Sequence, residues 1–150
     1  IQVINSLGFE VNYSLASERY AEGMYDKWLE KVLNHEDDIR RIYLEVSGSE
    51  KPADWHPLQV VCENCSKIGT TKVTNWDGKK ASYKCLPDLV KWAVGCGHEG
   101  EIVPFKGAGK LPWKVEWPVK WAGYQVDIEG AGKDHCAAGG SHDIGEAIAS

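Results

Sequence analysis

Four cysteines in the middle of the chain have the residue type and the spacing to bind a metal ion. Cys62 and Cys65 form a Cys-x-x-Cys pair, and Cys85 and Cys96 follow further along the chain. Zinc is held in tetrahedral sites by four thiolate or imidazole ligands, and two thiolates at this spacing reach one ion from a single turn. The four cysteines therefore predict a closed, structural zinc site that leaves no coordination position for catalysis.

His98 is an alternative ligand at this site, because it lies two residues beyond Cys96 in a Gly-Cys-Gly-His stretch. Ten residues separate Cys85 from Cys96, which is wider than a second Cys-x-x-Cys pair, so His98 could replace either of them. A simpler alternative is that some of these thiols are merely buried, since a free cysteine packs as a small hydrophobic residue. An odd total of five cysteines, most of them clustered, favours a metal site in a reducing cytoplasm over a disulfide framework.

A second candidate site is the glycine-rich stretch 130–141, which follows a predicted strand and precedes a predicted helix. It contains Gly132, Asp134 and His135. Glycines let a ligand approach the backbone, and the N–H groups at the start of a helix bind anions or ribose hydroxyls. A carboxylate in such a turn can bind an ammonium or a hydroxyl group. The simpler alternative is a tight turn in which Asp134 caps the following helix.

Three tryptophans, Trp113, Trp117 and Trp121, are spaced four residues apart upstream of this turn. Pro118 argues against one continuous helix, because its ring would clash with the preceding turn. We therefore expect a helix to begin at Pro118 and Trp113 to lie in the strand or loop before it, as the candidate wall of a pocket. Trp117 and Trp121 are equally consistent with the core. No catalytic nucleophile is recognisable, and Cys136 is expected to be a pocket or packing residue.

The elements that must position these residues fall into three stretches. Apolar and polar residues alternate at 9–15, which predicts a strand, and a helix is predicted to follow with Ser17 as its N-cap. Two apolar stripes at helical spacing, within 24–33 and 39–46, predict buried scaffold helices, the second starting near Asn34.

Residues 47–54 have the composition of a linker, and the character of the sequence changes after it. Short β-like pieces follow at 58–61, 70–74 and 81–84, with Asp77-Gly78 at a hairpin turn. A strand at 124–128, the glycine-rich turn and a helix through 144–148 complete the chain. This order predicts an α/β fold: part of a Rossmann-like nucleotide-binding fold with an inserted small zinc-ribbon-like β module.

The composition is typical of an ordinary soluble globular protein, with 43% hydrophobic and 26% charged residues. No apolar run approaches the roughly 18 residues of a membrane span, so we expect no membrane partner. The net charge of −5 is uneven: residues 62–121 carry 10 basic and 6 acidic residues, whereas 1–61 carry 6 and 11 and 122–150 carry 1 and 5. A basic middle suits a polyanion, although a solvated lysine-rich surface explains it equally well.

The chain begins without an initiator methionine or the basic region of a signal peptide, and it ends within a predicted helix. We therefore expect both ends to be cut within a longer fold.

The stretch Gly109–Trp121 and the turn Gly132-Lys133-Asp134-His135 closely resemble class I lysyl-tRNA synthetases. In that family a W-x-x-x-W-P-x-x-W run precedes a strand and a G-K-D-H turn, and a zinc-binding insertion lies just upstream, as the cysteines at 62–98 do here. The resemblance implies three regions. Residues 1–55 would end the first Rossmann half with its connecting helices, 56–108 would form the zinc-binding insertion, and 109–150 would start the second half.

The resemblance also implies site residues and partners. Trp113 and His135 match residues that line a lysine pocket, and Gly132 and Asp134 match an element near the ribose of ATP and the amino acid. The reaction implied is activation of lysine by ATP, with magnesium, followed by transfer to tRNA(Lys) in the cytoplasm. The family's HIGH-like and KMSKS-like motifs are absent, so we expect an internal fragment that is inactive alone. The rival hypotheses are a stand-alone zinc-ribbon module that binds nucleic acid or protein, and another class I synthetase.

Overall fold

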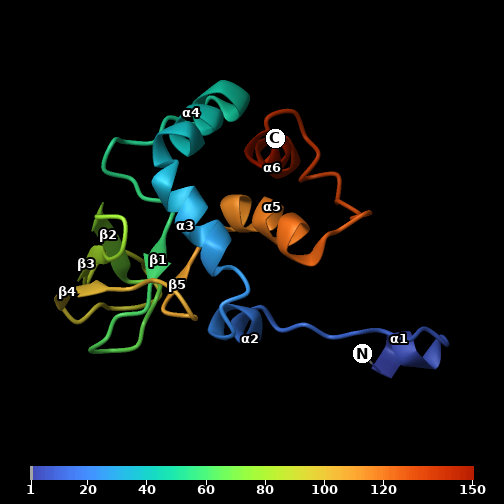
Figure 1. The fold of residues 1–150 in the computed structure, drawn as a ribbon, viewed down its shortest axis with the longest axis horizontal. Coiled ribbons are helices and arrows are strands. Elements are labelled where there is room, and N and C mark those ends of the chain that lie inside the picture. Colours follow the sequence, from blue (N-terminus) through green and yellow to red (C-terminus); the bar gives the residue numbers. More distant parts are fainter. Residues whose placement is uncertain (1) are drawn as a thin grey trace.

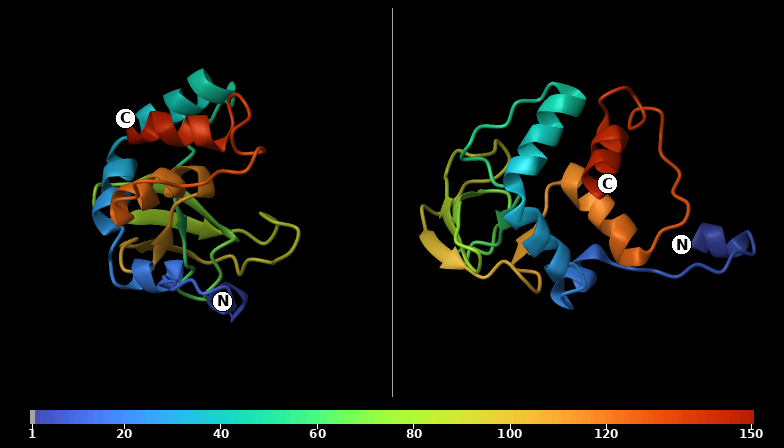
Figure 2. Two further views of the ribbon diagram at one scale, coloured as in Figure 1. Left: turned by 90° about the vertical axis from the view of Figure 1, so that its right-hand side faces the viewer. Right: turned by 45° about the horizontal axis from the view of Figure 1, so that its top comes forward.

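Helices α3 (Asp26–Asn34) and α4 (Glu36–Ser47) run through the middle of the molecule, with a small β module on one side and a pair of helices on the other (Figures 1 and 2). This arrangement is that of a computed structural model, which describes residues 2–150. Two short helices precede α3, namely α1 (Gln2–Ser6) and α2 (Ala16–Ala21). An extended segment leads from α2 to α1, which lies away from the rest of the molecule (Figure 1).

The apolar stripes predicted for the two central helices are confirmed, because their residues form part of the core: Leu29, Val32, Leu33, Ile39 and Tyr43. Helix α4 begins with Glu36, Asp37 and Asp38 in its first turn, where negative charge suits the positive end of the helix dipole. It ends at Gly48, whose φ of 67° is readily adopted only by glycine. The earlier helix starts one residue before the predicted Ser17 cap, with Leu15 at the N-cap position.

The β module consists of two small antiparallel sheets. Strands β2 (Thr71–Trp76), β3 (Ala81–Cys85) and β4 (Glu99–Ile102) form one sheet in that order, and β1 (Gln59–Val60) pairs with β5 (Gly109–Lys110) in the other. The three predicted strand pieces are thereby confirmed. Strands β4 and β5 were not predicted, because their sequences, Glu-Gly-Glu-Ile and Gly-Lys, have few of the residues that favour strands; pairing with a neighbour makes them strands.

The hairpin predicted at Asp77-Gly78 is confirmed. The Asp77 carboxylate accepts hydrogen bonds from the backbone N–H groups of Lys79 and Lys80, both at 2.7 Å. Gly78 has a φ of 94°, which a residue with a side chain adopts only under strain. A local turn signal was therefore sufficient to locate this reversal of the chain.

Helix α5 (Trp113–Tyr124) is continuous through Pro118, so the prediction that a helix begins at Pro118 is wrong. Pro112 marks the start instead, because it is the N-cap and its carbonyl accepts hydrogen bonds from amides of the first turn. Pro118 removes one helical hydrogen bond, but it is buried and faces Gly145 of the last helix, α6 (Ser141–Ala149). The two helices pack closely at this small residue. Helix α6 confirms the helix predicted through 144–148.

The strands predicted at 9–15 and 124–128 are wrong. Residues 9–15 are extended but unpaired, and Tyr124 ends α5, after which Gln125 has a φ of 52°. A strand needs a neighbour for its backbone N–H and C=O groups, and within residues 2–150 no segment pairs with either stretch. The apolar side chains that suggested strands are exposed instead: Phe9, Tyr13, Leu15, Val126 and Ile128.

One hydrophobic core joins the central helices to the β module and to α5, and it includes Leu29, Val60, Tyr83 and Val115. The architecture is therefore a mixture of helices and strands with small sheets, and both sheets formed by residues 2–150 are antiparallel. None of the helices among these residues is long and apolar enough to cross a membrane.

Candidate metal centre and aromatic site

The thiols of Cys62, Cys65, Cys85 and Cys96 lie together in the β module, with all four sulfur atoms within 4.8 Å of one another. The Sγ atoms of Cys62 and Cys96 are 3.6 Å apart, and those of Cys65 and Cys85 are 3.7 Å apart. A disulfide would bring two sulfur atoms to about 2.05 Å. A tetrahedral zinc ion with Zn–S bonds of about 2.3 Å would place its sulfur ligands about 3.8 Å apart. The cluster therefore has the dimensions of a tetrahedral metal site.

Backbone hydrogen bonds shape the two turns that carry these thiols. In the first turn the Cys62 carbonyl accepts a bond from Ser66, and the Cys62 amide donates one to Lys67, at 2.8 and 2.9 Å. The second turn is closed by Gly97, whose amide donates to the Cys85 carbonyl at 2.9 Å and whose φ is 79°. These backbone hydrogen bonds close both turns and bring the thiols near one another.

Polar contacts shift the pKa values of two of the thiols in opposite directions. A hydrogen bond from the Asn64 side chain, aided by one from the His98 backbone, lowers the pKa of Cys96 to about 6. A hydrogen bond from the Lys67 backbone lowers the pKa of Cys65, but loss of water contact and hydrogen bonds with the other thiols outweigh it and raise that pKa to about 11. The thiolate is the form that binds metal, so the contacts around Cys96 favour the binding form.

The structure does not bring His98 into the cysteine cluster. Its ring lies against that of Tyr83, with the two centroids 6.0 Å apart, and its carbonyl accepts a hydrogen bond from the Cys85 amide. The Tyr83 hydroxyl in turn accepts the N–H of Glu63, next to the first cysteine. His98 and Tyr83 therefore support the turns that carry the thiols.

A second cluster consists of alternating indole and imidazole rings, which we call the aromatic ladder. The rings follow one another along α5 in tilted or edge-to-face contacts, with centroids of neighbouring members 5.3 to 6.1 Å apart, in the order Trp113, His135, Trp117, His142 and Trp121. The tryptophans share one face of α5 because residues four apart in a helix lie above one another. This shared face was not predicted, because the sequence analysis expected Trp113 to lie outside the helix.

The glycine-rich turn places the two histidines on the ladder. The His135 amide donates to the Gly132 carbonyl at 2.9 Å, and the His135 carbonyl accepts the amide of His142 at 3.0 Å. Gly140 is essential to this path, since a Cβ there would lie 2.6 Å from the His135 carbonyl oxygen. The turn thus returns the chain along α5 and places each imidazole against two indoles.

The residues predicted for this site lie close together but differ in exposure. Trp113 is 47% exposed, and Gly132 and Asp134 are exposed at the turn. The alternative in which Asp134 caps α6 is wrong, because Gly140 is the N-cap and Asp143 accepts the N–H of Gly139 at 2.8 Å. The structure therefore leaves the Asp134 carboxylate facing solvent.

A pocket of about 210 Å³ adjoins the far end of the ladder and was not predicted. Its aromatic side is formed by Trp117, Trp121 and His142, and Glu129 and Glu146 contribute carboxylates. The Trp121 indole N–H donates to Glu129. Nothing in the local sequence identified His142 or Glu129, because the pocket forms only where the turn folds back on α5.

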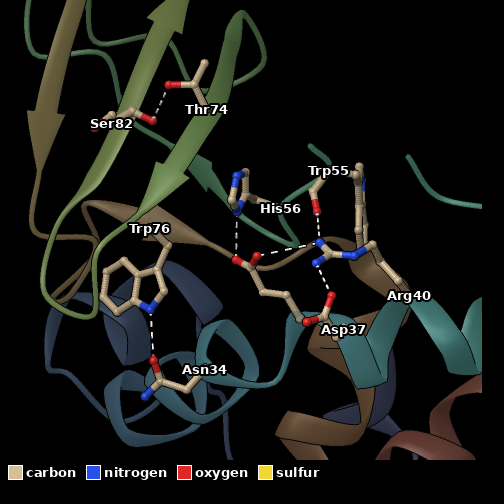
Figure 3. Close-up of polar contacts among 9 residues, drawn as sticks. Asn34, Asp37, Arg40, Trp55, His56, Thr74, Trp76 and Ser82 are labelled. Carbon is tan, nitrogen blue, oxygen red and sulfur yellow. Dashed lines mark hydrogen bonds and ion pairs between the residues drawn. The ribbon is translucent and has the colours of Figure 1, made fainter. Parts of the chain in front are cut away.

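A set of polar contacts, which we call the polar bridge, ties the central helices to the β module (Figure 3). His56 Nδ1 lies 2.8 Å from a Glu36 carboxylate oxygen, and Arg40 donates to the carbonyl of Trp55 at 2.6 Å. Arg40 also donates a hydrogen bond to the Asp37 carboxylate at 2.6 Å. A further bond joins the Trp76 indole to Asn34 at 2.9 Å. The module is thereby fixed to α3 and α4 by directional bonds as well as by the shared core.

Comparison with known proteins assigns these features to a class of enzyme. A family model described as tRNA synthetases class I (K) matches residues 1–150, and the chain therefore belongs to this class I tRNA synthetase family. A match over the whole chain argues against the stand-alone zinc-ribbon hypothesis, which accounts for the β module only.

The curated relatives, which come from archaea, are ligases for lysine. The chain is similar to the lysine–tRNA ligases of Methanocaldococcus jannaschii (39% identical, over 99% of this chain and 27% of the relative) and Archaeoglobus fulgidus (38%, over 99% and 28%). It is also 39% identical to the lysine–tRNA ligase of Methanosarcina barkeri, over 99% of this chain and 26% of that protein. The chain thus spans about a quarter of the length of these relatives.

Proposed function

We propose that this chain is part of a lysine–tRNA ligase of the cytoplasm, which activates lysine with ATP and transfers the lysyl group to tRNA(Lys). The proposal rests above all on the match to the family over residues 1–150, within which the relatives are lysine–tRNA ligases. The first step joins the lysine carboxylate to the α-phosphate of ATP and releases pyrophosphate. The second passes the lysyl group from the adenylate to a ribose hydroxyl at the end of the tRNA and releases AMP.

Trp113, His135 and Asp134 are the residues we propose for lysine binding. The exposed part of the Trp113 ring offers a flat aromatic surface to the aliphatic stem or the ammonium group, and a cation–π contact can stabilise the latter. His135 holds that ring from one side, at 5.3 Å between centroids. The exposed carboxylate of Asp134 supplies a negative charge for an ammonium group.

Gly132 and Asp134 are the residues we propose to lie near the ribose of ATP. A Cβ at Gly132 would have only the His135 ring as a neighbour, at 3.9 Å, so its backbone is open to a ligand. The Asp134 carboxylate could accept hydrogen bonds from ribose hydroxyls. Magnesium would accompany the phosphates of ATP, as it does in enzymes that transfer phosphoryl or nucleotidyl groups.

We propose that Cys62, Cys65, Cys85 and Cys96 hold one structural zinc ion. Their sulfur spacing of 3.6 to 3.7 Å supports a tetrahedral ion, and four thiolate ligands leave no position for a catalytic water. The zinc would stabilise the zinc-ribbon-like β module and take no part in the reaction.

We also propose a division of the chain in which residues 1–55 end one Rossmann half, 56–108 form the zinc-binding insertion and 109–150 begin the second half. The exposed apolar residues of 9–15 and 124–128 support this division. Each stretch could become a strand if another part of a longer protein, such as these relatives, supplied a neighbour.

The test is lysine-dependent exchange of pyrophosphate into ATP by the full-length protein that contains this chain. We expect exchange with lysine and none with arginine, ornithine or glutamate in its place. Exchange that depends on a different amino acid would overturn the lysine assignment but leave the class I assignment intact.

A further inference from the structure

Glu116 is the only charged residue that is buried among residues 2–150, and nothing proposed above uses its carboxylate. It lies in the first turn of α5, three residues after Trp113, and is 6% exposed. Negative charge suits the N-terminal end of a helix, but taking a carboxylate out of water costs free energy unless other groups neutralise it. The contacts that neutralise Glu116 therefore matter for how this end of α5 is held.

Two lysines reach the Glu116 carboxylate, one from each side of Trp113 in the sequence. Lys120 Nζ lies 3.0 Å from Oε2, and Lys110 Nζ lies 3.9 Å from Oε1. Oε1 is buried and has no hydrogen-bond partner among the residues that the structure describes, so the charge of Lys110 is what it faces. Since Lys110 belongs to β5, the carboxylate ties the end of this strand to α5.

Tyr20 of α2 approaches the same junction between β5 and α5. Its hydroxyl accepts the N–H of Leu111 at 3.3 Å, and the residue is 5% exposed. Burial raises the pKa of Tyr20, and the negative charge of Glu116 raises that pKa further, so the phenol keeps its proton. Helix α2 is thereby joined to the residue two positions before Trp113.

The backbone of Trp113 is enclosed by these contacts. The Pro112 carbonyl accepts the N–H groups of Val115 at 2.9 Å and of Glu116 at 2.8 Å, which closes the first helical turn around Trp113. Residues three apart in a helix are neighbours on its surface, so Glu116 lies next to Trp113 on α5. The aromatic ladder holds the ring of Trp113, whereas its backbone depends on the junction between β5 and α5.

We propose that Glu116 is a positioning residue for the lysine site. Its buried carboxylate, held by Lys110 and Lys120 beside Tyr20, fixes the junction between β5 and α5. That junction sets where the Trp113 ring meets the lysine side chain, which Glu116 itself does not touch. A buried ion pair contributes little net stability compared with an apolar side chain of similar size, but its contacts are directional. The inference rests on the proposed function, because it requires Trp113 to be a wall of the lysine site.

The first test compares Glu116→Met with the unsubstituted full-length protein in lysine-dependent pyrophosphate exchange. Methionine keeps the size of the side chain and removes the charge, and both lysines can turn to solvent, so the midpoint of thermal unfolding should change little. We expect the KM for lysine to rise about fivefold to tenfold, because a displaced wall binds the lysine side chain less well. The wall contacts lysine before and during the reaction alike, so kcat should be nearly unchanged.

This split between KM and kcat separates positioning from stability. If Glu116 only stabilised the fold, Glu116→Met would reduce the amount of folded enzyme, which lowers the apparent kcat and leaves the KM for lysine unchanged. That outcome would overturn the proposal, as would unchanged values of both. Glu116→Gln should recover part of the lysine affinity, because its amide oxygen can still accept a hydrogen bond from Lys120. Equal KM values in the methionine and glutamine variants would show that the polar contacts position nothing.

Glu45→Met is the matched control. Glu45 also lies on a helix and pairs with a basic residue four positions away, Arg41, but its side chain is 59% exposed. We expect its substitution to leave the KM for lysine unchanged. An equal rise in Glu45→Met and Glu116→Met would overturn the proposal, because the effect would then follow from losing any helical ion pair.

Tyr20→Phe tests the junction without altering a charge. It keeps the buried ring and removes only the hydroxyl that accepts the Leu111 N–H. The KM for lysine should rise, and combining this substitution with Glu116→Met should raise it by less than the product of the two separate effects, because both act on one junction. An unchanged KM in Tyr20→Phe would overturn the proposal, even if Glu116→Met failed to fold.

A signal from Trp113 itself separates this proposal from the ligase function. In the full-length protein labelled with fluorotryptophan, the fluorine resonance of Trp113 is identified by its absence in Trp113→Phe. Glu116→Met should shift this resonance and Glu45→Met should not. An unshifted resonance in Glu116→Met would overturn the positioning role while the ligase function stands. Absence of lysine-dependent exchange in the unsubstituted protein would overturn the ligase function, whatever the resonance of Trp113 does.

Discussion

The indole of Trp113 and the imidazole of His135 lie with their ring centroids 5.3 Å apart, although one opens α5 and the other belongs to the irregular turn after that helix. Trp117 touches both rings, at 4.7 and 5.6 Å. The position of the exposed indole therefore depends on how the turn folds back. Substitutions in the turn should consequently displace the Trp113 ring.

Replacing Trp113 by alanine in the full-length protein should raise the lysine requirement for pyrophosphate exchange well over tenfold. A cation–π contact in a desolvated pocket contributes about 2 kcal/mol, and a smaller change is expected in the KM for ATP. Trp113→Phe should recover part of the loss because it restores an aromatic face. Unchanged lysine dependence in Trp113→Ala would place this ring in the core of the parent protein.

Gly140→Ala should disturb the lysine site without touching a proposed binding residue. The added Cβ would lie 2.5 Å from the Ala137 carbonyl oxygen and 2.6 Å from that of His135, so the turn must shift. We expect a several-fold rise in the KM for lysine and altered tryptophan fluorescence as His135 leaves the indoles. Gly130→Ala is the control, because no atom lies within 4 Å of a Cβ there. Equal effects of the two substitutions would contradict the role given to the turn.

Cys62→Ser should lower the metal content from about one zinc ion per chain to nearly none, measured by elemental analysis. Structural zinc contributes about 10–16 kcal/mol of apparent binding free energy, so amides of the β2–β3 hairpin should also exchange faster with solvent. Cys136→Ser is the control, because Cys136 is exposed and outside the cluster. Zinc retained in Cys96→Ser but lost in His98→Ala would show that the fourth ligand is wrongly assigned.

Arg40→Ala should lower the free energy of unfolding by about 1–3 kcal/mol, because it leaves the Trp55 carbonyl without its donor and removes the ion pair between Arg40 and Glu36. The Arg40 side chain is 17% exposed. Its neighbour Arg41 is 58% exposed and also forms ion pairs on the same helix. Arg41→Ala should therefore lower the free energy of unfolding by only about 0–1 kcal/mol. Urea denaturation of both variants gives the comparison. A similar loss in both would mean that the polar bridge contributes no more than surface charge.

The 150-residue chain by itself should show no lysine-dependent pyrophosphate exchange. It contains one proposed wall of the lysine site, and loss of even one preorganised donor typically lowers a rate by about 10²–10³. The measurement compares the chain with the full-length protein after host synthetase has been removed. Exchange at even about a thousandth of the parent rate would locate catalysis in residues that we treat as scaffold.

Local patterns in the sequence were sufficient to predict the two central helices and the hairpin turn of the β module. The apolar stripes of α3 and α4 repeat with the helical period, and Asp77-Gly78 has the residues that its turn requires. The cysteines were grouped correctly as a set because metal ligands are few and chemically distinct. That grouping needed no knowledge of the fold.

Elements that depend on distant parts of the chain were predicted poorly. The stretch 9–15 has the alternation of a strand but no partner within residues 2–150, and β5 is a strand only because Gly109 and Lys110 pair with β1. By the local rule Pro118 should interrupt a helix, yet α5 is continuous through it and Pro118 packs against Gly145 of α6. Pairing and packing of this kind are decided between segments, where a single sequence carries little information.

The pairing of β1 with β5 has a consequence for how such a protein can vary. Gln59 lies opposite Lys110 and Val60 opposite Gly109, so the chain enters and leaves the β module through two neighbouring strands. The intervening loop is therefore already closed at its base, and lengthening a closed loop adds only about 0.6 kcal/mol of entropy for each doubling. Homologous proteins should consequently tolerate insertions and deletions between these strands, provided that the two strands still pair and the turns that carry the thiols are retained. The spacing between the two halves of the cysteine set should then be a poor guide to kinship, whereas the residues flanking the base should align readily.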